Sequence, residues 1–378
     1  MATSLDERYL RRALQLAERA RGHTHPNPLV GAVVVREGTV VGEGYHLRAG
    51  EAHAEVQALR QAGELARGAT VYVSLEPCDH FGRTPPCSLA LLQAGVRRVV
   101  VAAREENPVA QGGLERLRKG GVEVEAGLLA EEARLQNEVF FTATRKGLPF
   151  VLLKAALSLD GKVATRRGDA RWITSPLSRR VAHAYRQWLP AVMVGVGTVL
   201  QDDPSLTVRE PDFRPFPHML EPPPLRDPWK VVLDTEARTP PGARLFRPGP
   251  RGERARVLIL VGKGAPAGRW KALEAQGAEV VELPREGGRV SLEAALSHLF
   301  DRGLDGVLLE GGPVLSGAFL ERGLVDKFAF FLAPKLLGEG RGVLEGFGVE
   351  RVSEAKGLRL VRKEWLEGDL WLEAYPEG

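Results

Sequence analysis

One histidine and two cysteines carry the most specific chemistry that this sequence offers. His53 is followed closely by Glu55, and Cys78 and Cys87 lie further along the same half of the chain. Imidazole nitrogen and thiolate sulfur are good zinc ligands, and a catalytic zinc site keeps one coordination position open for water. The spacing therefore predicts a zinc site with His53, Cys78 and Cys87 as its three protein ligands.

Glu55 is placed to act on a zinc-activated water without being a ligand itself. Zinc lowers the pKa of its water to about 7, and a nearby carboxylate can take the water proton and pass it to leaving ammonia. His-x-Glu followed by Pro-Cys is typical of zinc deaminases, which continue with Cys-x-x-Cys, whereas Cys87 is the ninth residue after Cys78 here. A structural zinc clip or two buried thiols would each leave Glu55 without a role.

The elements that must position these residues alternate between strands and helices. Residues 29–36 and 39–45 are rich in Val and Gly and predict a β-hairpin. Periodicity predicts helices at 4–22, 53–66, 88–93, 114–119, 131–138, 178–187 and 315–320, and strands at 70–75, 96–102, 151–157, 191–194, 231–233, 257–261, 306–310 and 327–332. This alternation indicates an α/β protein.

A polar stretch at 144–149 divides the chain, and a second α/β series begins after it. A length of 378 residues is more than one domain usually takes. We therefore expect two domains, at 1–146 and 147–378. Residues 204–250 are rich in proline and are expected to be mostly loop around one strand.

The composition narrows the class of protein. Hydrophobic residues make up 44% and charged residues 26%, which is typical of a globular protein. We expect no membrane segment and no signal peptide, and the scarcity of cysteine favours a reducing, cytoplasmic location. The net charge is +4, but basic and acidic residues are mixed, so we expect no nucleic acid partner. The alternative is a nucleic-acid or nucleoside deaminase with a non-catalytic C-terminal domain. If that domain bound RNA, it would need aromatics interleaved with basic residues, whereas aromatics are only 6%. If it were a dimerisation module, the protein would not bind NADPH.

Four motifs of the first half together resemble the family of bifunctional riboflavin biosynthesis proteins, in which a pyrimidine deaminase is fused to a reductase. The motifs are residues 24–31, 41–46, 53–55 and 76–87. The resemblance implies a cytidine-deaminase-like α/β/α sandwich whose substrate is a pyrimidine ribosyl phosphate. Asn27, His46, His80 and Arg83 would contact that substrate. The chain departs from the family at 105–106, where Glu-Glu replaces the usual Asp-Pro.

The second half resembles the reductase domain of the same family, at residues 154–161, 172–175, 194–198, 202–209 and 310–312. On its own, Gly195-Val196-Gly197 lacks the third glycine of a dinucleotide fingerprint. Gly311 and Gly312 follow a predicted strand, where phosphate could approach a helix N-terminus. The resemblance implies a dihydrofolate-reductase-like α/β domain that uses NADPH. The implied cofactor contacts are Ala156, Trp172, Thr198, Asp202, Thr235, Gly312, Pro313, Val314, Leu315, Ser316, Gly317 and Ala318.

The implied substrate contacts of the reductase are Lys154, Arg186, Leu206, Arg209 and Glu310. Arginine can bind phosphate bidentately, and an ionised glutamate accepts hydrogen bonds from sugar hydroxyls. The proton donor stays open among Lys154, Asp160 and a bound water. Ala170 stands where the family often has a serine that contacts substrate, and Arg171 is a candidate to replace that contact. The family implies deamination, then NADPH-dependent reduction of the ribosyl group to a ribityl chain, in a homo-oligomer (dimer or tetramer).

Overall fold

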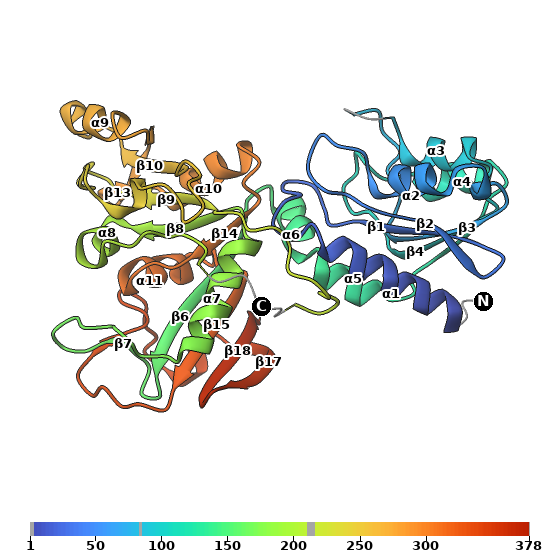
Figure 1. The fold of residues 1–378 in the computed structure, drawn as a ribbon. Coiled ribbons are helices and arrows are strands. Elements are labelled where there is room, and N and C mark those ends of the chain that lie inside the picture. Colours follow the sequence, from blue (N-terminus) through green and yellow to red (C-terminus); the bar gives the residue numbers. More distant parts are fainter. Residues whose placement is uncertain (1–3, 83–84, 210–215, 378) are drawn as a thin grey trace. The chain divides into compact units, whose positions relative to one another are not determined.

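The computed structural model describes residues 4–82, 85–209 and 216–377, and contacts divide the chain into two units. The first unit comprises Met1–Gly147 with Arg214–Pro224, and the second comprises Leu148–Phe213 with Leu225–Gly378. Each unit has its own main β-sheet and its own helices (Figure 1). The predicted α/β class is therefore confirmed. Among the described residues, no helix has the length and apolar character needed to cross a membrane.

The first unit is a five-stranded sheet with helices on both faces. The strand order is β2-β1-β3-β4-β5, with β1 antiparallel to its two neighbours and the β3, β4 and β5 pairings parallel. The strands are β1 (Gly31–Arg36), β2 (Thr39–Tyr45), β3 (Thr70–Leu75), β4 (Arg98–Ala103) and β5 (Glu123–Ala126). Helices α2 (Ala54–Ala62), α3 (Cys87–Gln93) and α4 (Gly113–Lys119) cover one face, and α1 (Ser4–Glu18) and α5 (Ala130–Gln136) cover the other (Figure 1). Helix α6 (Glu138–Lys146) ends the unit's continuous part.

The alternation of side chains along β1 explains this layering. Ala32 and Val34 lie in the core cluster beneath α2, α3 and α4. Val33 and Val35 point to the opposite face and pack with α1. Because helices cover both faces of the sheet, β3 and β4 consist of almost continuous runs of buried residues, many of them valine.

Two glycines of β2 let helix α2 lie close on the sheet. A Cβ atom at Gly42 would lie 2.2 Å from the Ala58 carbonyl oxygen, and one at Gly44 would lie 2.3 Å from the Ala54 carbonyl oxygen. Only glycine can approach a helix backbone this closely. These two positions therefore fix the first turn of α2, which carries His53 and Glu55, against the sheet.

The second unit is built on a nine-stranded sheet in the order β11-β10-β9-β8-β14-β6-β15-β18-β17. Seven strands are parallel: β6 (Phe150–Ser158), β8 (Ala191–Gly195), β9 (Trp229–Leu233), β10 (Val257–Gly262), β11 (Glu279–Leu283), β14 (Gly306–Leu309) and β15 (Lys327–Ala333). The hairpin β17 (Leu358–Leu366) and β18 (Asp369–Pro376) adds antiparallel strands at one edge. The helices are α7 (Pro176–Trp188), α8 (Val196–Asp202), α9 (Ala267–Glu274), α10 (Leu292–Asp301) and α11 (Pro313–Glu321).

Minor elements complete the described chain. Two short ribbons pair β7 (Lys162–Ala164) with β16 (Arg341–Gly342) and β12 (Arg285–Glu286) with β13 (Arg289–Val290). Short 3-10 helices lie at Gly63–Ala66, Arg244–Phe246 and Val352–Glu354. The core of the second unit joins alternate residues of the parallel strands to the apolar faces of α10 and α11.

The structure corrects several predicted boundaries. The first helix ends at Glu18 and turns replace its predicted last residues. The predicted helix at 53–66 breaks at Gly63, whose φ of 54° leaves the helical region. The polar stretch at 144–149 is not a break throughout, because α6 continues to Lys146 and only Gly147 ends it. Strands β5 and β11, helices α6, α8, α9 and α10, and the hairpin β17–β18 were not predicted.

One segment of the second half of the sequence belongs to the first unit. The Phe216 ring lies 4.4 Å from Arg21 Cζ, and His218 Nε2 lies 2.9 Å from Glu132 Oε2. His23 Nε2 lies 2.7 Å from the Pro224 carbonyl oxygen. The proline-rich region predicted as loop thus contains a docked segment at 216–224, which the sequence analysis did not anticipate.

Candidate deaminase and reductase sites

His53, Cys78 and Cys87 converge at one point of the first unit. His53 is the N-cap of α2, Cys78 follows β3, and Cys87 is the first residue of α3. His53 Nδ1 lies 3.5 Å from Cys78 Sγ and 3.2 Å from Cys87 Sγ, and the three ligand atoms lie within 4.8 Å of one another. Both cysteines are free thiols. One nitrogen and two sulfurs at this spacing fit a tetrahedral zinc ion with one position open.

The electrostatics of the cluster favour a bound cation. A hydrogen bond with Cys87 and a second contact with His53 lower the pKa of the Cys78 thiol to about 4, and the bond between the sulfurs raises the pKa of Cys87. Burial raises the pKa of Glu55 to about 7. A cation beside these groups would favour both thiolates and the carboxylate. The donor set therefore suits a zinc ion, whose positive charge would stabilise both thiolates.

A cavity of about 360 Å³ opens beside the cluster and contains Glu55 in its lining. Asn27, His46 and His80, all predicted to contact substrate, also line it. Arg83, the remaining predicted contact, lies outside the described residues. The structure thus brings the described members of the predicted deaminase site together around one cavity.

The polar residues of this cavity are held in defined orientations. Asn27 Nδ2 lies 3.0 Å from His46 Nε2, and His46 Nδ1 lies 3.4 Å from the Ala52 carbonyl oxygen. This pattern places the ring proton on Nδ1, because a carbonyl can only accept. Burial lowers the pKa of His46, which favours that neutral form. His80 Nδ1 is buried and has no hydrogen-bond partner among the described residues, so a ligand atom could satisfy it.

Glu105 and Asn107 line the same cavity, although the sequence analysis did not select them. Glu105 Oε1 accepts the backbone N–H groups of Glu106 and Asn107, at 2.9 and 2.8 Å. The glutamate that departs from the family pattern therefore organises its own loop at the cavity wall. The departure from the family pattern at 105–106 was the sequence signal that could have found it.

The second unit contains a buried ion-pair cluster at the carboxyl ends of its central strands. Arg186 Nε and Nη2 donate to the two carboxylate oxygens of Glu310, at 2.7 and 2.8 Å. Lys154 Nζ lies 3.3 Å from Glu310 Oε2. Burial alone would raise the pKa of Glu310, but the charges of Arg186 and Lys154 hold it below its ordinary value. The predicted substrate contacts Lys154, Arg186 and Glu310 thus lie together, from β6, α7 and the end of β14.

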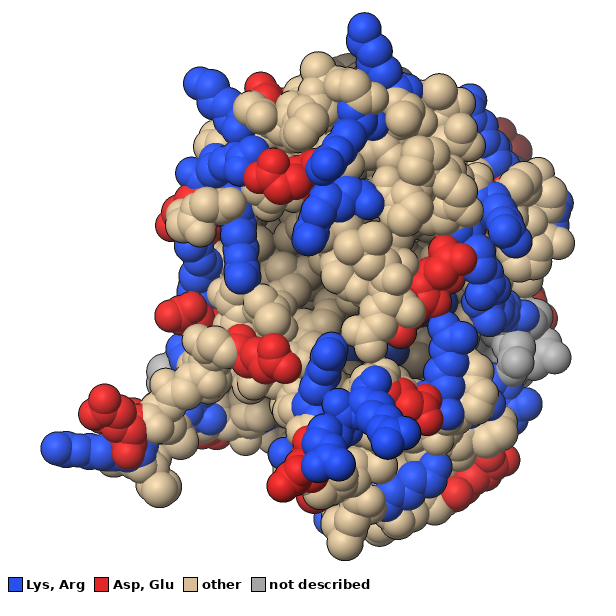
Figure 2. Space-filling view, turned by 90° about the vertical axis from the view of Figure 1, so that its left-hand side faces the viewer, with Lys and Arg blue, Asp and Glu red and all other residues tan. Residues whose placement is uncertain are grey.

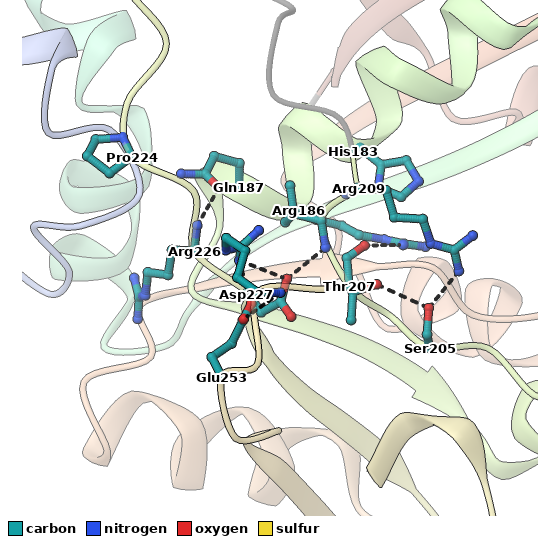
Figure 3. Close-up of polar contacts among 12 residues, drawn as sticks. His183, Arg186, Gln187, Ser205, Thr207, Arg209, Pro224, Arg226, Asp227 and Glu253 are labelled. Atoms are coloured by element: carbon teal, nitrogen blue, oxygen red, sulfur yellow. Dashed lines mark hydrogen bonds and ion pairs between the residues drawn. The ribbon is translucent and has the colours of Figure 1, made fainter. Parts of the chain in front are cut away.

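Loop 205–209 lies beside this cluster and is held by side chains on two sides (Figure 3). Arg186 Nη1 donates to the Thr207 carbonyl oxygen at 2.9 Å. Asp227 Oδ1 accepts the Val208 N–H at 2.8 Å. Arg209 Nη2 donates to Ser205 Oγ at 2.6 Å. These bonds place Arg209 near Arg186, and Leu206, the fifth predicted contact, is buried within the loop.

Most predicted cofactor residues lie at the same edge of the sheet. Gly312 is the N-cap of α11, and a Cβ atom at Gly312 would lie 3.7 Å from Thr198 Oγ1. The starts of α8 and α11 are therefore neighbours at the carboxyl ends of β8 and β14, where open α/β sheets bind ligands. A Cβ atom at Gly317 would lie 2.1 Å from the Glu345 carbonyl oxygen, so this glycine is required for packing. Ala156 is on β6, and Pro313, Val314, Leu315, Ser316 and Ala318 belong to α11.

Other predicted residues of the second unit are engaged in local contacts. The Thr235 hydroxyl accepts the Val290 N–H at 3.2 Å. Arg171 Nη2 donates to the Asp202 carbonyl oxygen at 2.7 Å, so its guanidinium is already committed. Trp172 is 61% exposed, and Arg179 Cζ lies 4.3 Å from its ring. The Asp160 carboxylate accepts from Ser158 and from the backbone of Leu337 and Gly338.

Figure 2 shows the face of the second unit that carries α8 and α9. This face is hollowed near its centre, and both basic and acidic side chains lie around the hollow.

Two protein families match the two halves of the chain. Residues 3–103 match the cytidine and deoxycytidylate deaminase zinc-binding region, and residues 149–369 match the RibD C-terminal domain. The riboflavin biosynthesis protein RibD of Aquifex aeolicus is 43% identical over 371 residues, covering 98% of each chain. RibD of Escherichia coli is 42% identical over 360 residues, covering 93% of this chain and 94% of that protein.

Solved structures show the same architecture over the whole chain. RibD of Acinetobacter baumannii matches with a TM-score of 0.85 at 35% identity and covers 99% of both chains. A Thermotoga maritima protein matches with a TM-score of 0.83 at 36% identity, covering 98% of this chain and 99% of that one. It is described as a diaminohydroxyphosphoribosylaminopyrimidine deaminase and 5-amino-6-(5-phosphoribosylamino)uracil reductase.

Proposed function

This chain belongs to the RibD family of riboflavin biosynthesis proteins, and from that premise we propose how its residues divide the work. It is a bifunctional enzyme that joins a deaminase to a reductase. We assign deamination to residues 1–146 and reduction to residues 147–378. The substrates are the two pyrimidine ribosyl phosphates named for the Thermotoga maritima relative. This function replaces the alternative of a nucleic-acid deaminase with a non-catalytic second domain.

In the deaminase, His53, Cys78 and Cys87 would hold a zinc ion, which when bound would supply a water acidic enough to lose a proton near neutral pH. Glu55 is the acid-base residue. It would accept a proton from the water, whose oxygen forms a bond to the ring carbon that carries the amine. Glu55 would then deliver the proton to that amine, so that the C–N bond breaks and ammonia leaves. The observation that carries this assignment is that Glu55, His53 and Cys78 line one cavity, while Cys87 completes the ligand cluster beside it. Asn27, His46 and His80 orient the ring, and Arg83 is assigned to the phosphate.

In the reductase, NADPH would, when bound, supply a hydride to the ribosyl carbon next to the pyrimidine amine. Lys154, Arg186, Leu206, Arg209 and Glu310 hold the sugar phosphate. Arg209 is not paired with Glu310, so its guanidinium can meet the phosphate. Asp160 is poorly suited to donate the proton, because donors from Ser158, Leu337 and Gly338 already engage its carboxylate. Lys154 and a bound water remain the candidate donors.

The nicotinamide cofactor is assigned to the carboxyl edge of the sheet, where Gly312 caps α11 beside Thr198. Backbone N–H groups at a helix N-terminus suit the cofactor phosphates. The remaining contacts assigned to NADPH are Ala156, Trp172, Asp202, Thr235, Pro313, Val314, Leu315, Ser316, Gly317 and Ala318. We assign NADPH rather than NADH because the motifs of this unit resemble a reductase family that uses NADPH.

The location and assembly of the enzyme follow from the same assignment. Two free thiols as zinc ligands require a reducing compartment, so we assign the protein to the cytoplasm. A homo-oligomer, dimer or tetramer, is the expected assembly.

Metal removal and cofactor choice test this proposal directly. Chelation should stop ammonia release from the diaminopyrimidinone substrate, and added zinc should restore it. NADPH oxidation with the deaminated intermediate should survive chelation and should have a lower KM for NADPH than for NADH. Ammonia release from metal-free protein, or equal KM values for the two nucleotides, would contradict the respective assignment.

A further inference from the structure

His183 occupies a position in the second unit that neither the family motifs nor the predicted site includes. We infer that His183 is a further substrate-contacting residue of the reductase, whose Nε2–H donates to a phosphate oxygen of the sugar phosphate held by Arg186 and Arg209. The inference rests on the proposed sugar-phosphate site. It adds a neutral donor between two guanidinium groups.

The helix α7 directs His183 and Arg186 to the same place. They lie three residues apart, which puts both side chains on one face of the helix. Arg186 reaches Glu310 and the Thr207 carbonyl oxygen. His183 reaches the backbone of Arg209, and Figure 3 shows its ring beside that arginine. The imidazole therefore belongs to the same cluster as the phosphate-binding arginines.

The contact with Arg209 fixes which ring nitrogen carries the proton. The Arg209 backbone N–H donates to His183 Nδ1 at 3.1 Å. A nitrogen that accepts a hydrogen bond has no proton, so the neutral ring must carry its proton on Nε2. The loop thus sets the tautomer, and Nε2 is a donor.

The donor at Nε2 has no protein partner in the described part of the chain. Arg209 occupies the other ring nitrogen, and the His183 side chain is half-buried. Burial, together with the positive charges of Arg186, Lys154 and Arg209, lowers the pKa of His183 to about 3. A neutral N–H adds a hydrogen bond to an anion without adding another charge to an already positive site.

A purely structural role would be to hold loop 205–209 through Nδ1. Two substitutions separate that role from substrate contact. In His183→Asn the amide oxygen can replace the Nδ1 acceptor, but nothing replaces the Nε2 donor. In His183→Gln the longer amide can place an N–H near Nε2. The Nδ1 acceptor is lost, but the Arg209 N–H is exposed and can bond to water instead, unlike the buried Val208 N–H held by Asp227. The pair therefore removes one function at a time.

The experiment follows NADPH oxidation with the deaminated pyrimidine ribosyl phosphate and measures KM and kcat for both variants. His183→Asn should raise KM on the order of tenfold or more, as expected for a lost hydrogen bond to a charged group, while His183→Gln stays close to wild type. The inhibition constant of ribose 5-phosphate should rise with KM in His183→Asn. Ammonia release should be unchanged in both, which shows that the proteins are folded.

The opposite pattern overturns the inference. If His183→Asn keeps the wild-type KM, the substrate does not need the Nε2 donor. If His183→Gln raises KM as much as His183→Asn does, a donor placed near Nε2 does not restore binding, and substrate contact through Nε2 is excluded. If the wild-type enzyme neither oxidises NADPH with the substrate nor is inhibited by ribose 5-phosphate, the proposed function fails, and this inference fails with it. The two failures are distinguishable because only the second appears before any variant is made.

Discussion

Asp227 should control how well the reductase holds its substrate, although we do not expect it to touch the substrate. Its Oδ1 accepts the Val208 N–H at 2.8 Å, and Val208 precedes Arg209, the arginine assigned to phosphate. Asp227 is 8% exposed and Val208 is 1% exposed. In Asp227→Ala the buried Val208 N–H would lose its partner, and water could not replace it without opening the loop.

The size of the effect follows from that burial. A buried donor left without a partner costs about 1–3 kcal/mol. At about 1.36 kcal/mol per factor of ten, this corresponds to about a 5- to 150-fold loss in the population of the correctly held loop. Asp227 also forms an ion pair with Arg251, but the two charged atoms lie 3.7 Å apart and the arginine is partly exposed. Loss of this ion pair therefore contributes little to the effect of the substitution. Asp227→Asn keeps an oxygen acceptor and should change KM by about threefold or less.

The assay compares both variants in the reductase and deaminase reactions. Asp227→Ala should raise the reductase KM for the sugar phosphate within the stated range, with a smaller change in kcat and unchanged ammonia release. Asp227→Asn should restore most of the affinity. A wild-type KM in Asp227→Ala would refute the argument, as would an equal loss in both variants, because the second result would mean that charge matters rather than the Val208 bond.

Three further outcomes are expected. Cys87→Ser should lower the zinc content measured by mass spectrometry while NADPH oxidation with the deaminated intermediate continues; full zinc occupancy would exclude Cys87 as a ligand. Gly113→Ala should weaken zinc retention against a chelator. The new Cβ would lie 1.8 Å from the carbonyl oxygen of Pro77 and would displace the backbone next to the ligand Cys78. Unchanged zinc retention would show that the loop adapts. Urea unfolding of the second unit should become easier as the pH falls from about 6.5 towards 3, because His183 has its pKa lowered to about 3 when folded and binds a proton earlier when unfolded. His183→Gln should reduce that slope, and an unchanged slope would contradict the lowered pKa.

The elements around the zinc site were predictable because they depend on local patterns. The hairpin β1–β2, the buried strand β3 and the helix that begins at Cys87 all follow from short runs of apolar residues between glycine and proline. The ligands and Glu55 were identifiable because their residue types have few other uses at that spacing. Glu105 was not selected, because its role depends on a loop that brings its carboxylate to the cavity wall.

The elements that sequence reasoning missed depend on distant partners. The segment 216–224 is held by Arg21, His23 and Glu132, which lie far away in the sequence, so its composition predicts only a loop. The hairpin β17–β18 carries many exposed and charged residues, because β17 is an edge strand, and its alternation is therefore weak. His183 is a single histidine on an amphipathic helix, and only the fold shows that it meets the Arg209 backbone.

The central claim is that one chain carries out deamination at Glu55 and then reduction in the second unit. The most direct test supplies zinc-loaded protein with NADPH and the diaminopyrimidinone ribosylamine phosphate and follows nicotinamide absorbance. The account predicts that the wild-type enzyme consumes NADPH, that Glu55→Gln retains zinc but does not, and that the deaminated intermediate restores consumption in Glu55→Gln. NADPH consumption by Glu55→Gln from the diamino substrate, or ammonia release by the wild type with no NADPH consumed, would contradict it.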